Sequence, residues 1–203
     1  MLKIIFRIVW IFEMKKNTEY LTKEELLSLN LATCGENVLI SRLAKIAHPE
    51  KLRIGNHVRV DDYCLLIGDI TIGNYIHIAP FSILSGHNII QLDDFCSISA
   101  RVSLYSAIDD YSGEHLINPT VPEKFKKAER GKIHLEKHVV LGVGTTVLPN
   151  VVIGEGVAVG AHSLVVLPLK PWGIYFGSPA KLLKARKRDI LQMEQALINN
   201  HES

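Results

Sequence analysis

The stretch from Val139 to Leu169 reads VVLGVGTTVLPNVVIGEGVAVGAHSLVVLPL. It fits neither the 3.6-residue period of an amphipathic helix nor the two-residue alternation of a half-buried strand. Its period is six: aliphatic residues recur at every sixth position, and the positions four further on hold mostly small or β-branched residues. The aliphatic series is Leu135, Leu141, Val147, Ile153, Val159 and Val165.

The same period runs through the upstream half of the chain. The series there is Ile54, Val60, Leu66, Ile72, Ile78 and Leu84, and it resumes after a slip of two residues as Leu92, Ile98 and Leu104. A fixed internal period indicates a repeat architecture. If each hexad forms one short strand and one corner, three hexads make a triangular coil, and coils stack about 4.8 Å apart. We therefore predict an all-β fold, a parallel β-helix whose coils bury their aliphatic residues against one another.

The remaining segments predict appendages to this β-helix. We expect an N-terminal extension and short helix over residues 1–34, the β-helix over 35–178 with a polar loop at 109–132, and a C-terminal helix over 179–203. Thr22 and Glu25 have the spacing of a capping box. Ser178 and Pro179 suit the start of a helix from about 180 to 199, which would cap the open end of the stack.

Residues 1–13 and the bulk composition limit the functional classes. The first thirteen residues are apolar, but they are too few to span a bilayer and lack a signal-peptide cleavage site; a membrane-surface anchor stays open. A net charge of +2 gives no case for nucleic acid. We read Cys34, Cys64 and Cys96 as buried thiols in a reducing compartment, neither bridged nor bound to metal, and expect a cytoplasmic protein.

A candidate catalytic site falls at the slip in the period. His87 lies in LSGHN, and Asp109 and Asp110 follow slightly more than one coil later, where the polar loop leaves. These residues should therefore lie near one corner on adjacent coils, giving an imidazole, a carboxylate to orient it and a covering loop. The alternative is a corner histidine bonded to solvent. His115 in the loop is a second candidate for the base, and His77 is a weaker third.

These hexads resemble those of the hexapeptide-repeat acyltransferases, whose β-helix is left-handed. The segments IGNYIHIAPFSILSGH, YSAIDDYSGE, NPTVP and WGIYFGSPAKLLK are similar to the surface-polysaccharide O-acetyltransferases of that superfamily. When the maltose and galactoside acetyltransferases are laid on this chain, their catalytic histidine falls on Asp109 and their substrate-binding aspartate on His87. The two residue types are thus exchanged relative to that pattern.

The resemblance implies acetyl-CoA bound between subunits, and we expect a homotrimer without a metal. By position, the residues that the resemblance assigns to the donor are Gly142, Val143, Gly160 and Ala161. Lys181, Lys184 and Arg186 are candidates to meet the CoA phosphates, unless they form a solvated helix face.

The main functional hypothesis is acetyl transfer to a hydroxyl of a sugar or polysaccharide precursor, with His87 as base and Asp109 as its orienter. A backbone amide near Gly142 would then hold the oxyanion. One alternative is N-acylation of a nucleotide-linked amino sugar, which needs the histidine less because an amine deprotonates more readily. A γ-type carbonic anhydrase, which needs three zinc-binding histidines, and a non-catalytic scaffold are less favoured.

Overall fold

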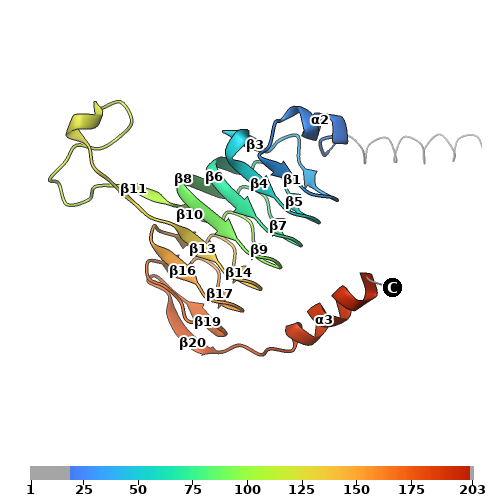
Figure 1. The fold of residues 1–203 in the computed structure, drawn as a ribbon. Helices are drawn as coiled ribbons and strands as arrows, with labels where there is room; N and C mark the ends of the chain where they lie inside the picture. The colour runs from blue at the N-terminus through green and yellow to red at the C-terminus, as the bar shows by residue number, and fades with distance from the viewer. Residues whose placement is uncertain (1–18, 202–203) are drawn as a thin grey trace, which may run out of the picture.

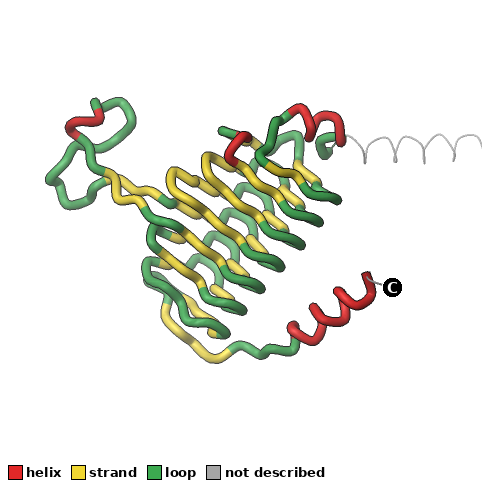
Figure 2. Tube along the Cα trace, in the orientation of Figure 1, coloured by secondary structure: helices red, strands yellow, loops and turns green. Residues whose placement is uncertain are grey.

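The computed structural model describes residues 19–201, so the predictions about residues 1–13 lie outside the described part. The chain winds into a stack of about seven coils with three walls (Figures 1 and 2). The predicted fold, a parallel β-helix with a protruding loop and a short C-terminal helix, is confirmed.

Each wall is a parallel sheet of short strands that follow one another at intervals of one coil. The first wall holds β1 (Thr33–Cys34), β4 (Leu52–Ile54), β13 (Ile133–Leu135) and β16 (Val151–Ile153). The second wall holds β2 (Leu39–Ile40), β5 (Arg59–Val60), β7 (His77–Ile78), β9 (Ser97–Ile98), β14 (Val140–Leu141), β17 (Ala158–Val159) and β19 (Gly173–Phe176). The third wall holds β3 (Lys45–Ala47), β10 (Ser103–Tyr105), β15 (Thr146–Val147) and β18 (Leu164–Val165). The longer strands β6 (Leu65–Ile72) and β8 (Ile83–Leu92) continue from the third wall into the first.

The aliphatic residues of the six-residue series form the core. Every one of them, from Ile54 to Val165, is at most 3% exposed. The strand register stacks them directly, so that Leu84 pairs with Leu104 and Leu104 with Val147. The packing between coils therefore supplies the burial that no single coil provides.

The cysteines divide between core and surface. Cys64 and Cys96 are buried, as predicted, and burial raises the pKa of Cys96 to about 12. Cys34 is exposed, so its predicted burial is wrong. It lies in the first coil, which no preceding coil covers. All three thiols are free.

A hairpin ribbon, residues 107–130, projects from the coils at the predicted loop (Figure 1). Its strands β11 (Ala107–Asp109) and β12 (Ala128–Arg130) pair antiparallel, and the 3₁₀ turn η2 (Glu123–Phe125) lies near its tip. The excursion begins two residues before the predicted boundary at 109. It leaves the stack at the end of the fourth coil, directly after β10.

The short helix predicted after the Thr22 and Glu25 capping box is present. The helix α2 (Lys23–Ser28) begins with the predicted capping box: the Glu25 backbone N–H donates to Thr22 Oγ1 at 3.3 Å, and the Thr22 N–H donates to Glu25 Oε2 at 2.7 Å. A second 3₁₀ turn, η1 (Pro49–Lys51), follows the first coil.

The predicted C-terminal helix over 180–199 is wrong in its first half. Lys181–Ala185 forms β20, which pairs antiparallel with β19, and the helix α3 covers only Ile190–His201. β19 is the last strand of its wall, and β20 satisfies its open edge. α3 runs beside the coils instead of capping their end (Figure 1).

The carboxylate of Glu194 links α3 to the coils by hydrogen bonds. Glu194 lies 2.6 Å from both Lys137 Nζ and His138 Nε2. Burial alone would raise the pKa of Glu194, but the hydrogen bonds from Lys137 and His138 outweigh burial and lower it. A lowered carboxyl pKa stabilises the fold above the ordinary value of 4.5, and this stabilisation is lost as the pH falls through the folded-state value.

Glu194→Gln should therefore lower the Tm by about 2–4 °C at pH 7, as expected for the loss of about 1 kcal/mol. The difference between variant and wild type should shrink as the pH falls below 4.5, because the carboxyl of the unfolded wild-type chain then binds a proton, and it should vanish once the pH passes the lowered folded-state value. Thermal unfolding followed by circular dichroism at pH 7 and pH 4 measures both values. A difference that grows on acidification contradicts the assignment.

Candidate active site

The ribbon is anchored to the coils by a serine that the sequence reasoning missed. Ser106 is fully buried. Its hydroxyl accepts the Asn88 backbone N–H at 2.8 Å and donates to the Ser85 carbonyl at 2.9 Å, while the Gly131 N–H donates to the Ser106 carbonyl at 2.9 Å. Ser106 therefore joins the start and the return of the ribbon to the coil that carries His87.

A pocket of about 630 Å³ lies between the ribbon and the third wall. We call it the ribbon pocket. Tyr105, Thr146 and Leu148 line it from the wall, and His87 and Asp109 line it at the corner and on β11. The structure thus brings these two predicted residues to one cavity. Its volume lies in the usual range for small-molecule sites.

His87 and Asp109 do not form the predicted oriented pair. Both residues are exposed, and within residues 19–201 no hydrogen bond joins the imidazole to the carboxylate. Asp109 belongs to β11 and pairs across the ribbon with Ala128, so its position follows the ribbon and not the coil below. The pocket therefore offers a carboxylate and an imidazole as separate groups.

Asp110 and His115, the other two predicted catalytic residues, pair with each other instead. Asp110 Oδ2 accepts the His115 backbone N–H at 3.0 Å and lies 3.1 Å from His115 Nδ1. Hydrogen bonds from Ser112, and to a lesser extent from His115, hold the pKa of Asp110 at about 2. Neither member of the pair lines the ribbon pocket. This geometry suits a carboxylate that organises the turn of the ribbon.

An oriented imidazole is present at His77, the weakest of the three histidine candidates. His77 Nε2 lies 2.7 Å from Asp61 Oδ2, and Arg59 Nε donates to Asp61 Oδ1 at 2.6 Å. The Asp61 side chain is 9% exposed. Burial would raise the pKa of Asp61, but the hydrogen bonds from His77 and Arg59 lower it. This cluster lies on the second wall, outside the ribbon pocket.

The predicted donor residues belong to a row of small residues at the end of the second wall. Backbone hydrogen bonds place the residues of this row in register. The N–H groups of Ala79, Ser99 and Gly142 donate to the carbonyls of Ile98, Leu141 and Val159, respectively. We call Ala79, Ser99, Gly142 and Gly160 the donor row. An added Cβ at Gly142 would lie 2.7 Å from the Ala161 nitrogen, so glycine is required for this close approach of two backbones. Val143 and Ala161 follow the row and are exposed.

The predicted phosphate-binding cations differ in their surroundings. Lys181 and Lys184 are exposed on β20. Lys181 pairs with Phe176 of β19, and Phe176 lies one coil beyond Gly160, the last residue of the donor row. Arg186 is already engaged: its guanidinium donates to the carbonyls of His138 and Gly156 at 2.9 and 3.0 Å. Burial lowers the pKa of Arg186. Arg186 therefore fastens the C-terminal segment to the coils.

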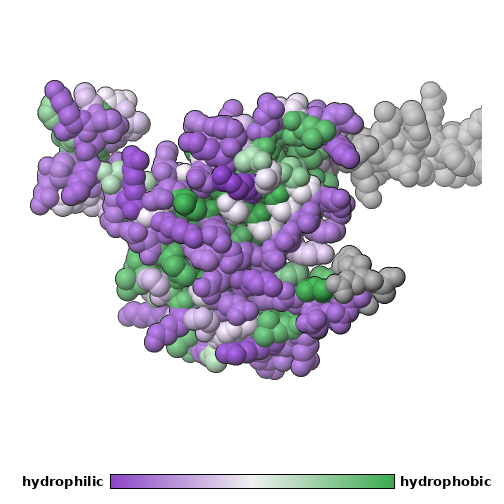
Figure 3. Space-filling model, in the orientation of Figure 1, coloured by the Kyte–Doolittle hydropathy of each residue, from purple (hydrophilic) through white to green (hydrophobic). Residues whose placement is uncertain are grey.

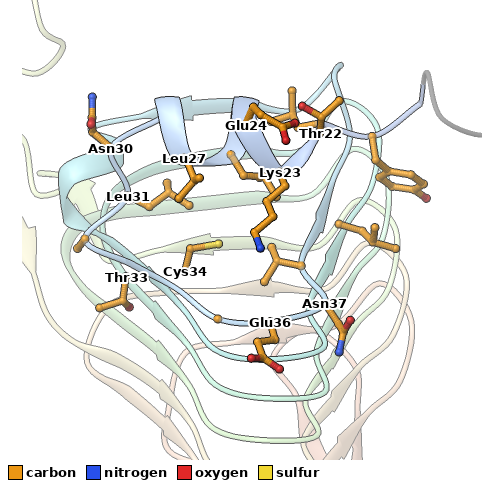
Figure 4. A pocket seen from close by; sticks show the side chains of 17 residues that line it. Thr22, Lys23, Glu24, Leu27, Asn30, Leu31, Thr33, Cys34, Glu36 and Asn37 are labelled. Carbon is orange, nitrogen blue, oxygen red and sulfur yellow. The ribbon is translucent and has the colours of Figure 1, made fainter.

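A larger cavity, about 1180 Å³, lies between α2 and the first coil. Figure 4 shows Lys23, Leu31 and Cys34 pointing toward its centre. None of its lining residues is a histidine or an aspartate. It therefore lacks an imidazole like that of His87, although Glu24 and Glu36 bring carboxylates to it, and we regard it as the incompletely filled end of the coil stack.

Within residues 19–201, no three His, Cys, Asp or Glu side chains are arranged to hold a metal ion. No helix there is long and apolar enough to cross a membrane.

Hexad coils, a projecting ribbon and a donor row of small residues together define an acyltransferase of the hexapeptide-repeat class. No protein-family model matches the chain, but whole-length relatives do. The chain belongs to the hexapeptide-repeat acyltransferases. It is 38% identical over 178 residues to the dTDP-4-amino-4,6-dideoxy-D-glucose acyltransferase of Escherichia coli, covering 86% of this chain and 93% of that protein.

Two further comparisons rank the functional hypotheses. AntD, an N-acyltransferase from Bacillus cereus solved with dTDP and 3-hydroxybutyryl-CoA, is 45% identical, with a TM-score of 0.90 over 92% of this chain and 100% of that one. The putative colanic acid biosynthesis acetyltransferase WcaF of Escherichia coli is 28% identical over 87% of this chain and 81% of that protein. The similarities therefore favour the N-acyltransferase alternative over the main O-acetyltransferase hypothesis.

Proposed function

We propose that this protein transfers an acyl group from acyl-CoA to the amino group of a nucleotide-linked amino sugar. Its similarity over nearly the whole chain to two proteins that act on such sugars or bind dTDP supports this acceptor. The observation that carries the proposal is the ribbon pocket, which presents Asp109 as a carboxylate that orients no imidazole.

An amine suits this pocket better than a hydroxyl does. A sugar hydroxyl needs a positioned base to remove its proton as it attacks, and His87 has no carboxylate to orient it. An amine attacks in its neutral form, and Asp109 would bind it and receive a proton. In the reaction the C–N bond forms and the C–S bond of the thioester breaks. The proton from nitrogen passes to Asp109 and then to the departing CoA sulfur.

A spacing in the Bacillus cereus enzyme supports Asp109 further. Its solved forms include variants at one aspartate and at a serine ten positions before it. In this chain Asp109 is the only aspartate with a serine ten positions before it, and that serine is Ser99 of the donor row. We therefore infer that Ser99 and Asp109 both lie at the reaction centre.

The donor row and the ribbon pocket lie on different edges of one subunit, so we propose that the complete site forms between two subunits of a homotrimer. The row lies at the end of the second wall, and the pocket lies at the end of the third. The outward residues between these edges are uncharged over five consecutive coils, which suits contact with another copy: Leu65, Ile83, Ser103, Thr146 and Leu164.

A matched pair of acceptors tests the function. With dTDP-4-amino-4,6-dideoxyglucose and either acetyl-CoA or 3-hydroxybutyryl-CoA, we expect CoA release and an N-acylated product. The dTDP sugar with a hydroxyl at the same carbon should react at least about 100-fold more slowly, since it lacks an equally ready nucleophile. A free-thiol assay with mass spectrometry of the product measures both rates. Faster turnover of the hydroxyl sugar would contradict the proposal and favour the O-acetyltransferase hypothesis.

A further inference from the structure

Two cationic side chains of the ribbon line the ribbon pocket, while Lys127 and Glu129 beside them do not. Lys126 has an extended backbone (φ −111°, ψ 152°) that leads into β12, and successive side chains of an extended chain point to opposite faces. Lys126, Ala128 and Arg130 line the pocket, whereas Lys127 and Glu129 do not. This alternation gathers two positive charges on the pocket face and leaves a small residue between them.

Neither cation is firmly committed to a partner within the protein. Lys126 Nζ lies 2.8 Å from Oε1 of Glu123, which also lines the pocket, but the Glu123 side chain is 85% exposed. Such an exposed partner contributes little stability and can turn away into solvent. Within residues 19–201, Arg130 forms no ion pair. Both cations are therefore available to an anion that enters the pocket.

The Asp109 carboxylate lies between these two cations. Asp109 pairs with Ala128 across the ribbon, and directly opposed side chains of an antiparallel pair share one face. Lys126 and Arg130 are roughly 13 Å apart along the extended chain, a gap that their long side chains can close. A nucleotide-linked amino sugar carries a positive charge at its ammonium group and negative charges on its diphosphate. The pocket is complementary to both.

We propose that Lys126 and Arg130 bind the diphosphate of the nucleotide-linked acceptor while Asp109 receives its amino group. The inference rests on the proposed function and adds a binding role for the ribbon. Arginine and lysine contacts to phosphate oxygens are charge-assisted hydrogen bonds. The visible surface of the ribbon is mostly hydrophilic (Figure 3), in keeping with a segment that binds a charged ligand.

CoA also carries phosphates, so the same chemistry has a second possible source. The ribbon pocket contains Asp109, the proposed amine-binding group, and no residue of the donor row. Lys181, in contrast, lies beside the end of that row. We therefore assign the ribbon cations to the acceptor, and the experiment separates the two sources.

The test uses the full-length protein with Arg130→Met, Lys126→Met and the matched control Lys127→Met, which removes a lysine between them that does not line the pocket. Titration calorimetry with dTDP and with thymidine isolates the phosphate contribution. Each pocket variant should weaken dTDP binding about 10-fold or more and thymidine binding less than about twofold. The control should bind both as the wild type does, and the KM for acyl-CoA should be unchanged throughout.

Equal weakening of dTDP and thymidine, or unchanged dTDP binding in both pocket variants, would overturn the inference. A rise in the KM for acyl-CoA alone would also overturn it, because it would show that the two cations bind the phosphates of the donor. The proposed function fails separately: if wild-type protein binds dTDP through these cations but does not acylate the amino sugar, the diphosphate site stands and the proposed reaction falls.

Discussion

Asp109→Asn is expected to lower kcat/KM for the amino-sugar acceptor about 100-fold or more, since proton transfer by a positioned side chain contributes about 10²–10⁴-fold. Asparagine keeps the size and shape of the side chain but can neither bind an ammonium group by charge nor accept its proton. Asp109 lies on the ribbon and outside the coil core, so the variant should unfold at the wild-type temperature. Steady-state kinetics with both substrates varied provides the measurement.

Glu129→Gln is the matched control for Asp109→Asn. Glu129 belongs to the same ribbon and pairs with Ile108, but it does not line the pocket, so its activity should stay within about twofold of wild type. His87→Ala separates the two possible bases. If the Asp109 variant keeps more than about a third of wild-type turnover while the His87 variant loses it, His87 is the base and our role for Asp109 is wrong.

Leu104→Ala should destabilise the fold by about 2–5 kcal/mol, the usual cost of a large cavity in a core. Leu104 is fully buried between Leu84 and Val147, the last residue of the six-residue series before the ribbon. The ladder continues on both sides, so the neighbouring coils cannot close the gap without losing their own register. Chemical denaturation provides the free energy of unfolding, provided that unfolding is two-state.

Leu167→Ala removes the same atoms from an outer corner. Leu167 is 69% exposed, and its loss should change the free energy of unfolding by no more than about 0.5 kcal/mol. Similar losses for the two variants would contradict the ladder as the source of stability.

The coil architecture was predictable because its signal is local and repeated. Each residue from Ile54 to Val165 in the six-residue series reports one inward position, and all of them are buried. The corner shared by His87 and the ribbon also followed from counting residues along the coil. The C-terminal segment carried no such signal. Lys181–Ala185 becomes a strand because the edge of β19 is open, and that contact depends on where the stack ends.

The interior of the ribbon was beyond sequence reasoning for a related reason. Which side chains are opposite each other in the ribbon depends on the pairing of Asp109 with Ala128. The eighteen residues between these two contain no pattern that predicts where the chain turns. Hence Asp110 and His115 appeared as catalytic candidates although they bind each other. Lys126 and Arg130 could not be predicted as site residues, because only the pairing and side-chain alternation of the ribbon place them beside Asp109.

The antiparallel return of β20 limits what the last coil can join. A stack of parallel coils ends in unpaired backbone groups onto which another molecule could continue the same winding, as in fibre growth. Here the chain closes that edge with its own reversed segment, and Lys181 and Lys184 add like charges to the outermost strand. Molecules at high concentration should accordingly remain discrete assemblies and not polymerise end to end.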